Sequence, residues 1–564
     1  MENKVLQFDN SIERYRSLAF NRLDNEDYIG ALDMLFSALN KEYSLEIIKD
    51  IAVVYANMEL YELSNRYWFT YLHKAKKEDI GIALEEIAFN YFYMDNLWAS
   101  SYYFNKKIEF DGQISRDNIP DEIVKHFAES IDIKDKYKIA YPFEETDYTE
   151  ELKKGRTAIA LGDLRTAKKT FKKVPKKSPQ GFEAEKELAV AEFLSGDVEK
   201  GIEITRKLII ENGESCALLC NLSSMYKSKE DKEKALYYYK KALTYPKKQE
   251  EDTYKLATCA LENEDHEKAV ELLTEILKER GLDVRLTHLY GLALLNCGKL
   301  TEGAKELNEL YRIDPTNLTN KYFANLANKM VDGVDTKGLT PFLYNGEIPY
   351  KEGNKRLSII GKVVEYDQLA REKELKKPYV NESVKWGLEM GEEEVAKACI
   401  FILSSSTNKE NIKYLLDKLL DDEFSADVKS IIIFMLVLAG CKNKMGVVSG
   451  GYYTTFKPKK LPFENEEKGK PFETAYALCL SRLAFTGFNS FNQLAIEINK
   501  AYKTLKNYEN IENLTKEIAV VCTILSDSKK INTHSACRIF NAKEDRVKEI
   551  LNYIKSRDLL WLKL

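Results

Sequence analysis

The sequence predicts an all-α protein built from stacked helix pairs, a solenoid. The stretch EDKEKALYYYKKAL at 230–243 returns as EDHEKAVELLTEIL at 264–277, 34 residues later. Apolar residues in both stretches recur at helical spacing, and a repeat at this interval means that each unit is one supersecondary element stacked on its neighbours. Only 26 Gly and 12 Pro occur among the 564 residues, so helices can fill most of the chain.

Two small residues mark each helix pair. The second of them recurs every 34 or 35 residues, at Ala167, Gly201, Ala235, Ala269 and Ala304. The first precedes it by twelve residues, or by thirteen in the last pair, at Gly155, Ala189, Ser223, Ala257 and Gly291. Both must be small because two antiparallel helices cross there. Acidic or glycine turns such as SGDVEK and ENEDHE then end one helix and cap the next.

This pairing resembles the tetratricopeptide repeat family, most closely over the array at 148–330. The resemblance implies a right-handed superhelical α-solenoid whose concave groove, lined by the first helix of every pair, holds a segment of another protein. Residues 1–110 keep the spacing of twelve in weaker repeats, at Ala19 and Ala31, Ala52 and Ser64, and Ala88 and Ser100. Residues 111–147 break the register and are predicted to form an irregular insertion or an altered repeat.

The resemblance also indicates which residues line the groove. On the family's groove positions this chain carries Arg156, Lys186, Asn221, Ser224, Tyr254 and Thr258, with Lys255 beside them. Lys and Arg attract carboxylates, and Asn bonds both sides of a peptide group, so these residues suit an acidic or extended peptide. The alternative is that they form an ordinary solvated face.

A basic patch lies on the second helix of the first pair of this array. It comprises Lys168, Lys169, Lys172, Lys173, Lys176 and Lys177. Such a stripe suits phosphate backbones or an acidic protein surface. With one aromatic residue in the run, it equally suits a solvated helix face.

The chain changes character after residue 330. Glycine and proline punctuation predicts a linker or extended segment at 331–380. Helical patterns at 381–404, 409–421 and 425–439 open a C-terminal helical domain, 381–564, that resembles HEAT-type repeats. Within it, MGVVSGGYYTTF places two glycines between β-favouring runs, which predicts a β-hairpin.

The last 55 residues have the outline of a helix-turn-helix, with Thr533 and Asn541 as expected N-caps. In a DNA reader, Lys543 and Arg546 would lie near bases and Arg538 near phosphate. Glu544 and Asp545 at the same tip oppose that hypothesis. A three-helix cap that covers the last apolar face of a solenoid is the alternative.

Signals for catalysis are poor. His266 and Glu267 begin a zinc-protease motif, but Val270 stands where the second histidine ligand belongs, and no phosphate-binding loop occurs. Nine scattered cysteines and the absence of a secretory pattern predict a reduced, cytoplasmic protein. The 85 basic and 90 acidic residues nearly cancel. We therefore expect a protein–protein interaction scaffold that is not an enzyme and has no catalytic residues, metal, cofactor or membrane span. The alternative hypothesis is a regulator that couples partner binding to nucleic acid.

Overall fold

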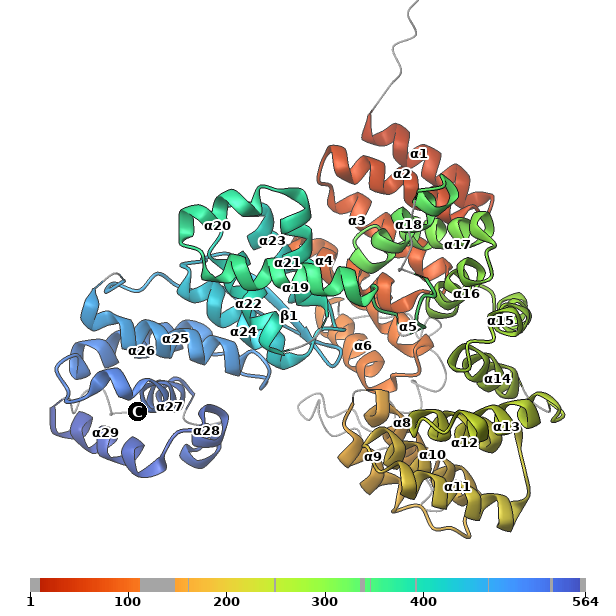
Figure 1. Cartoon of the computed structure of the whole chain (residues 1–564). Helices are drawn as coiled ribbons and strands as arrows, with labels where there is room; N and C mark the ends of the chain where they lie inside the picture. Colours follow the sequence, from red (N-terminus) through yellow and green to blue (C-terminus); the bar gives the residue numbers. More distant parts are fainter. Residues whose placement is uncertain are drawn as a thin grey trace, which may run out of the picture. The chain divides into compact units, whose positions relative to one another are not determined.

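The computed structural model describes residues 11–111, 148–160, 162–247, 250–334, 340–344, 346–390, 393–464, 466–527 and 531–557 (Figure 1). The chain forms two compact units. Unit 1 comprises Met1–Lys136 together with Glu352–Leu564, and unit 2 comprises Tyr137–Lys351. The predicted insertion at 111–147 lies outside the described residues, apart from Asp111 at the end of a helix.

Unit 2 is the array that the 34-residue period predicts. Its helices are α8 (Thr149–Ala160), α9 (Leu164–Phe171), α10 (Gly181–Leu194), α11 (Val198–Asn212), α12 (Cys216–Ser228), α13 (Lys232–Leu243), α14 (Glu250–Glu262), α15 (His266–Arg280), α16 (Val284–Asn296), α17 (Leu300–Ile313) and α18 (Leu318–Val331). The first helices of successive pairs are α8, α10, α12, α14 and α16, followed by α18. Separate apolar clusters join neighbouring pairs, as expected when each pair buries its face against the next.

The small residues lie at the helix crossings. Ser223 donates its hydroxyl to the carbonyl oxygen of Ala235 at 2.8 Å, so the two predicted partners touch. A Cβ on Gly201 would lie 3.0 Å from the carbonyl oxygen of Ala189. In the last pair, a Cβ on Gly303 would lie 3.0 Å from the carbonyl oxygen of Gly291, so Gly303 and not Ala304 is the crossing residue. The period is therefore 34 residues throughout.

The turns within pairs share one geometry. The residue before each cap has a left-handed backbone, with φ of 92° at Gly196 and 60° at Glu264. In four of the five pairs of unit 2 the next residue is an aspartate that accepts a hydrogen bond from the N–H group three residues later, as Asp197 does from Lys200 and Asp265 from Lys268. In the α16–α17 pair Lys299 takes this position and forms no side-chain cap. Side-chain oxygens satisfy N–H groups that the helix start leaves without partners, which explains the acidic turn signal.

Unit 1 begins with three further helix pairs. These are α1 (Ile12–Asp24), α2 (Tyr28–Lys41), α3 (Leu45–Asn57), α4 (Tyr61–Lys74), α5 (Ile80–Tyr93) and α6 (Leu97–Asp111). Ser64 donates to the carbonyl oxygen of Ala52 and Ser100 to that of Ala88, both at 2.8 Å and twelve residues apart. These contacts repeat the one at Ser223, so the weak N-terminal signal also marks helix crossings.

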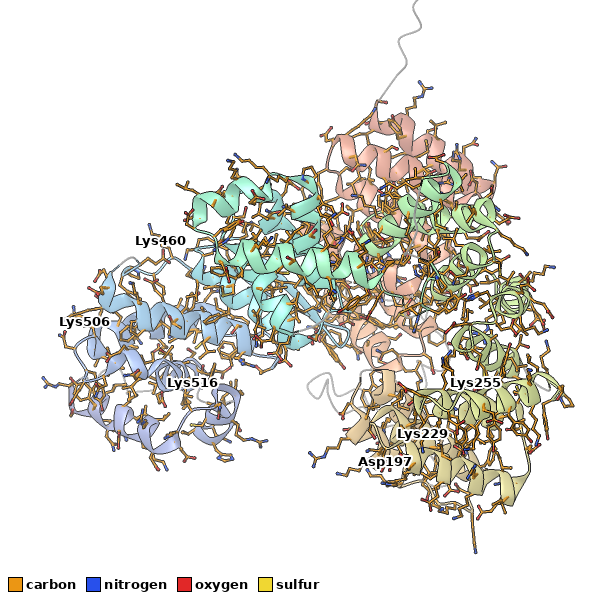
Figure 2. All side chains as sticks on the ribbon, in the orientation of Figure 1. Asp197, Lys229, Lys255, Lys460, Lys506 and Lys516 are labelled. Atoms are coloured by element: carbon orange, nitrogen blue, oxygen red, sulfur yellow. The ribbon has the colours of Figure 1, made fainter. Side chains whose placement is uncertain are left out.

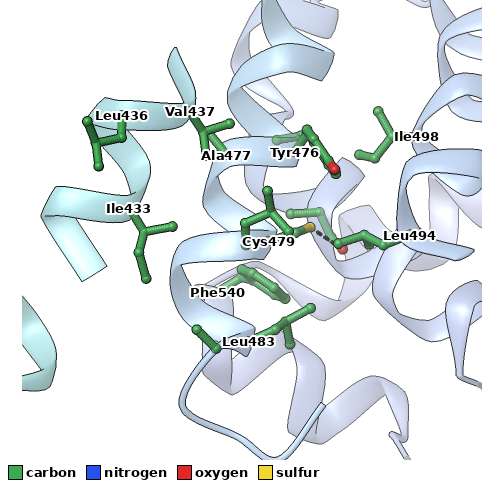
Figure 3. Packing of buried hydrophobic residues seen from close by; sticks show 14 of the residues in the cluster. Ile433, Leu436, Val437, Tyr476, Ala477, Cys479, Leu483, Leu494, Ile498 and Phe540 are labelled. Carbon is green, nitrogen blue, oxygen red and sulfur yellow. Dashed lines mark hydrogen bonds between the residues drawn. The ribbon is translucent and has the colours of Figure 1, made fainter. Parts of the chain in front are cut away.

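The C-terminal part of unit 1 contains eleven α-helices among its described residues. They are α19 (Tyr350–Glu365), α20 (Gln368–Leu375), α21 (Pro378–Glu389), α22 (Glu393–Ser404), α23 (Lys409–Lys418), α24 (Ala426–Leu438), α25 (Lys470–Leu483), α26 (Phe491–Leu505), α27 (Thr515–Ser526), α28 (Thr533–Phe540) and α29 (Glu544–Arg557). One apolar cluster runs through them. Figure 3 shows Cys479 and Leu483 of α25 among residues of α24, α26 and α28.

The prediction of a linker over 331–380 is wrong for α19 and α20. Arg356, Ile360 and Val363 form a buried stripe at helical spacing along α19. Gly361 has open space around it, so this glycine is tolerated on an exposed helix face and does not end the helix. The pattern at 381–404 likewise divides into two helices, α21 and α22.

The predicted hairpin is present. Strands β1 (Met445–Ser449) and β2 (Tyr452–Phe456) pair antiparallel, with Ser449 opposite Tyr452 and the two glycines between them. The hairpin packs against α4, α5 and α6. The rings of Tyr453 and Phe69 of α4 stack at 6.4 Å between centroids, and Tyr452 meets Tyr102 of α6 edge to face at 5.0 Å. Tyr91 of α5 lies beside Gly451 of the turn. Residues far apart in the sequence thus form one unit.

The last three helices, α27, α28 and α29, have the expected helix-turn-helix outline, but their caps differ from the prediction. Asn532 caps α28 by accepting from the N–H of Ser535 at 2.8 Å, so Thr533 is the first helical residue. Asn541 ends α28 in a left-handed conformation, φ 50°, and does not cap α29. Asparagine adopts this conformation more readily than most residues, which explains its place after the helix.

Within the residues that the structure describes, no helix is both long and apolar enough to cross a membrane.

Candidate partner-binding site

The predicted groove residues all lie on first helices of unit 2. Arg156 is on α8 and Lys186 on α10, while Asn221 and Ser224 are on α12 and Tyr254, Lys255 and Thr258 on α14. Figure 2 shows the side chain of Lys255 on α14. Because stacked helix pairs place their first helices side by side, these residues belong to one surface. We call it the first-helix face.

The two cations nearest the start of this face already have acidic partners. Arg156 binds Glu187 through its Nε at 2.9 Å and also pairs with Glu183, and the buried Lys186 lies 2.8 Å from Glu183. Sequence reasoning missed Glu183 and Glu187, which lie three residues before Lys186 and directly after it. A partner's carboxylate would compete with both glutamates for these cations.

Polar contacts also join α12 and α14. Ser224 donates to Glu262, and Lys227 pairs with Glu264 at 3.5 Å. Thr258 donates within its own helix, to the carbonyl oxygen of Lys255 at 2.9 Å. These pairings leave other groove residues available to a ligand.

Asn221, Tyr254 and Lys255 are the half-buried residues of this face whose side chains form no hydrogen bond with any other described residue. Together they offer an amide, a phenol and an ammonium group. That set can donate to carbonyl or carboxylate oxygens and can accept from an N–H group.

Farther along the same face, unit 2 already holds a piece of chain. Asn296, the last residue of α16, donates its amide to the carbonyl oxygen of Phe342 at 2.9 Å and accepts from the N–H of Phe342 at 2.8 Å. Residues 340–344 have no regular secondary structure, so their backbone groups have no partners in a helix or sheet. One side chain therefore binds both backbone polar groups of a single residue.

Side-chain contacts fix the same segment. The Phe342 ring is 3% exposed and meets Phe323 of α18 edge to face, with 5.9 Å between centroids. The Tyr344 hydroxyl lies 2.6 Å from Nδ1 of His266 and accepts from Asn296 at 3.0 Å. Burial raises the pKa of Tyr344 to about 12, so its hydroxyl keeps its proton at neutral pH. An apolar anchor with polar contacts beside it is the usual arrangement for peptide recognition.

Asn296 was not among the predicted residues, although the sequence carries a signal for it. It lies one period of 34 residues after Glu262, which contacts the predicted Ser224. The segment that Asn296 binds was interpreted as part of a linker, so nothing in the sequence indicated a ligand for this position.

The basic patch is partly neutralised within unit 2. Lys168 and Lys172 bind Glu192 at 3.1 and 3.3 Å, and Lys200 binds it at 2.8 Å. Although desolvation acts to raise it, hydrogen bonds from these lysines lower the pKa of Glu192 to about 2. Lys176 pairs with Glu185. Lys169, Lys173 and Lys177 are exposed and form no ion pair with a described residue.

The candidate nucleic-acid contacts Arg538, Lys543 and Arg546 are exposed around the turn between α28 and α29. Glu544 at that turn lies 3.0 Å from Lys548 and 3.6 Å from His534. Positive and negative charges therefore alternate on this tip. Both hypotheses for it, DNA contact and simple cap, remain predictions.

The cysteines of unit 2 include one buried group, Cys216, Cys220 and Cys259. Hydrogen bonds with Cys216 and Cys259 raise the pKa of Cys220 well above its usual value, so the Cys220 thiol is protonated. Metal binding needs thiolates. Nowhere in the described parts of the chain do three or more His, Cys, Asp or Glu residues gather as a metal site.

Comparisons with known proteins match the repeats. Residues 152–214 match the tetratricopeptide repeat family, and residues 228–310 match the family described as anaphase-promoting complex, cyclosome, subunit 3. Among solved structures, the human IFIT1 dimer with PPP-AAAA is similar at 15% identity and a TM-score of 0.29, over 76% of this chain and 95% of that chain. No curated protein matches the chain. The predicted resemblance of these helix pairs to tetratricopeptide repeats is confirmed.

Proposed function

We propose that unit 2 holds an extended segment of a partner protein on its first-helix face. Tetratricopeptide repeats generally mediate protein–protein interactions. The observation that carries the proposal is the binding of Phe342 by Asn296, through both the N–H and the carbonyl oxygen of that residue. Unit 2 thus already binds a non-helical segment through its main chain as well as its side chains.

In this proposal the partner segment lies on α12 and α14, which form a part of the first-helix face that residues 340–344 do not cover. Asn221 contacts the partner's main chain, Tyr254 packs against a side chain, and Lys255 attracts a carboxylate. The basic patch supports nucleic-acid binding less well, because Glu192 and Glu185 already pair with three of its lysines.

The test is mass spectrometry of the proteins that co-purify with the chain from its own cells, with and without nuclease. We compare wild type with a double variant, Asn221→Ala and Tyr254→Ala. The matched control is Lys240→Ala, an exposed residue of the second helix α13. A defined protein set that survives nuclease and the control substitution, but is lost from the double variant, supports the proposal. Equal recovery with wild type and the double variant contradicts it, and loss of the whole set on nuclease treatment favours nucleic acid as the tether.

A further inference from the structure

Unit 1 contains a cavity of about 650 Å³ where its N-terminal helix pairs meet the C-terminal helices. One wall is the end of α4, with His73 and Lys74. A second wall is α23 and the residue before its cap, and the third is the start of the hairpin at Asn443–Gly446. Its volume falls within the ordinary range of small-molecule sites, so the cavity is large enough for a ligand the size of a nucleotide.

Positive charge dominates the lining. Lys74, Lys409, Lys413 and Lys444 face two carboxylates, Glu410 and Asp417, which leaves a net positive charge. Lys74, Lys409 and Lys413 form no ion pair with any carboxylate of the described residues, unlike the lysines around Glu192. Burial raises the pKa of Asp417, whereas Lys74, Lys413 and Lys418 act to lower it.

The lysines converge from different parts of the chain. The ammonium groups of Lys74 and Lys413 lie 4.3 and 5.3 Å from the centre of the same ring, Tyr43. Lys444 donates to the carbonyl oxygen of His73 at 3.2 Å, which holds it at the rim. Like charges repel, so an excess of cations in one cavity indicates a place for an anion.

The backbone adds to the positive field. Thr407, Lys409 and Glu410 line the cavity at the first turn of the ten-residue helix α23, which Asn408 caps. The N–H groups of Thr407 and Glu410 already donate to Glu372 and to the side chain of Asn408, so the backbone contributes here through the helix dipole, which favours an anion at this end. The same face of α23 presents Ile412 and Leu416 to the cavity, with Leu420 just beyond, so cationic and apolar side chains line one space.

We propose that this cavity binds a phosphate-bearing small molecule the size of a nucleotide. Lys74, Lys409 and Lys413 hold its phosphate groups at the start of α23. Its less polar part lies on Ile412, Leu416 and Leu420. The site is in unit 1 and is independent of the partner face proposed for unit 2.

Isothermal titration of the full chain tests the site with three probes: ATP, inorganic pyrophosphate and adenosine. We expect ATP to bind, pyrophosphate to bind more weakly because it leaves the apolar wall uncovered, and adenosine to give no heat. The double variant Lys74→Met and Lys413→Met should weaken ATP binding by at least about tenfold, since two charge-assisted contacts are lost. The single variant Lys413→Met should bind ATP with an affinity between those of the double variant and the wild type.

The matched control is Lys362→Met with Lys376→Met, two exposed lysines of unit 1 outside the cavity. It should bind ATP as wild type does, and circular dichroism should show the same helix content in every variant. The proposal fails if ATP and pyrophosphate give no heat at roughly millimolar concentration, or if adenosine binds as well as ATP. It also fails if pyrophosphate binds as tightly as ATP. The same conclusion follows if the lysine variants and the control variant bind ATP with equal affinity.

Discussion

The hydroxyl of Tyr103 donates a hydrogen bond of 2.6 Å to the carbonyl oxygen of Gly451, which is 348 residues farther along the chain. Tyr103 is 1% exposed, and its ring stacks on that of Tyr91 at 5.9 Å between centroids. Gly451 belongs to the hairpin turn, and its N–H donates to Asp422 at 2.8 Å. The contact joins the last N-terminal helix pair to the C-terminal part of unit 1.

Tyr103→Phe should destabilise unit 1, because it leaves the buried carbonyl oxygen of Gly451 without its donor. The expected loss is about 1–2 kcal/mol of unfolding free energy, measured by urea denaturation followed by circular dichroism. Tyr93→Phe is the control, since Tyr93 is 60% exposed. Equal stability of the two variants would show that the hydrogen bond contributes nothing.

Gly451→Ala should be more destabilising than Gly450→Ala. Both glycines have positive φ, 83° and 55°, so each alanine meets backbone strain. Only at Gly451 does the new Cβ also meet neighbours, the Ala99 Cβ at 3.0 Å and the Tyr91 Cζ at 3.2 Å. We expect a difference of about 1–3 kcal/mol from this overpacking, measured as the shift between the two urea midpoints. If the two variants have the same urea midpoint, the hairpin turn is not packed against α5 and α6.

His288 should make unit 2 less stable in mild acid. Desolvation lowers the pKa of this 8% exposed side chain from 6.5 to about 4. Between these values the unfolded chain binds more protons than the folded one, so stability is complete above pH 6.5 and falls as the pH drops toward 4. The slope from this residue is at most about 1.4 kcal/mol per pH unit.

Replacement of His288 by leucine tests this effect. The wild-type urea midpoint should fall between pH 7 and pH 5 by more than that of His288→Leu, because leucine binds no proton. His534→Gln is the control, since the side chain of His534 is 74% exposed. A pH dependence in His288→Leu as steep as in wild type would rule out this histidine as its source.

Lys168→Met should reduce the stability of unit 2, whereas Lys169→Met should not. Lys168 binds Glu192, which is 3% exposed, and also donates to Ser195 at 3.0 Å. Two lysines remain on Glu192 after the substitution, so we expect a loss of about 1 kcal/mol. The melting temperatures of the two variants, measured by thermal unfolding, are compared. Identical melting curves would mean that the lysines around Glu192 do not stabilise the fold.

The repeat pattern predicted the helix crossings because a crossing imposes one local requirement, a small residue, on the sequence. Ser64, Ser100 and Ser223 all meet it and donate to the residue twelve positions earlier or later. The shift from Ala304 to Gly303 was not predictable, because both residues are small and only the backbone distance to Gly291 distinguishes them. Where two small residues are adjacent, the sequence alone does not show which of them lies at the helix crossing.

The charge contacts were less predictable than the helices. The sequence places Arg156 in the ligand groove and Lys168 in the basic patch, but it does not indicate their partners Glu187 and Glu192, which lie 31 and 24 residues away on a neighbouring helix. Such a pairing depends on how helices stack, which periodicity does not specify. The same holds for Asn296 and Phe342, whose contact needs a non-helical segment to lie across α16.

Unit 1 is made of two stretches of chain that are separated by the whole of unit 2, and this order has a consequence during translation. At roughly 5–20 residues per second, Tyr103 is synthesised on the order of tens of seconds before Gly451. For that time the aromatic surface of Phe69, Tyr91 and Tyr103 has no hairpin to cover it. A ribosome that stalls within unit 2 would therefore present a folded repeat array with an exposed aromatic patch, a form that quality-control factors recognise by its apolar surface.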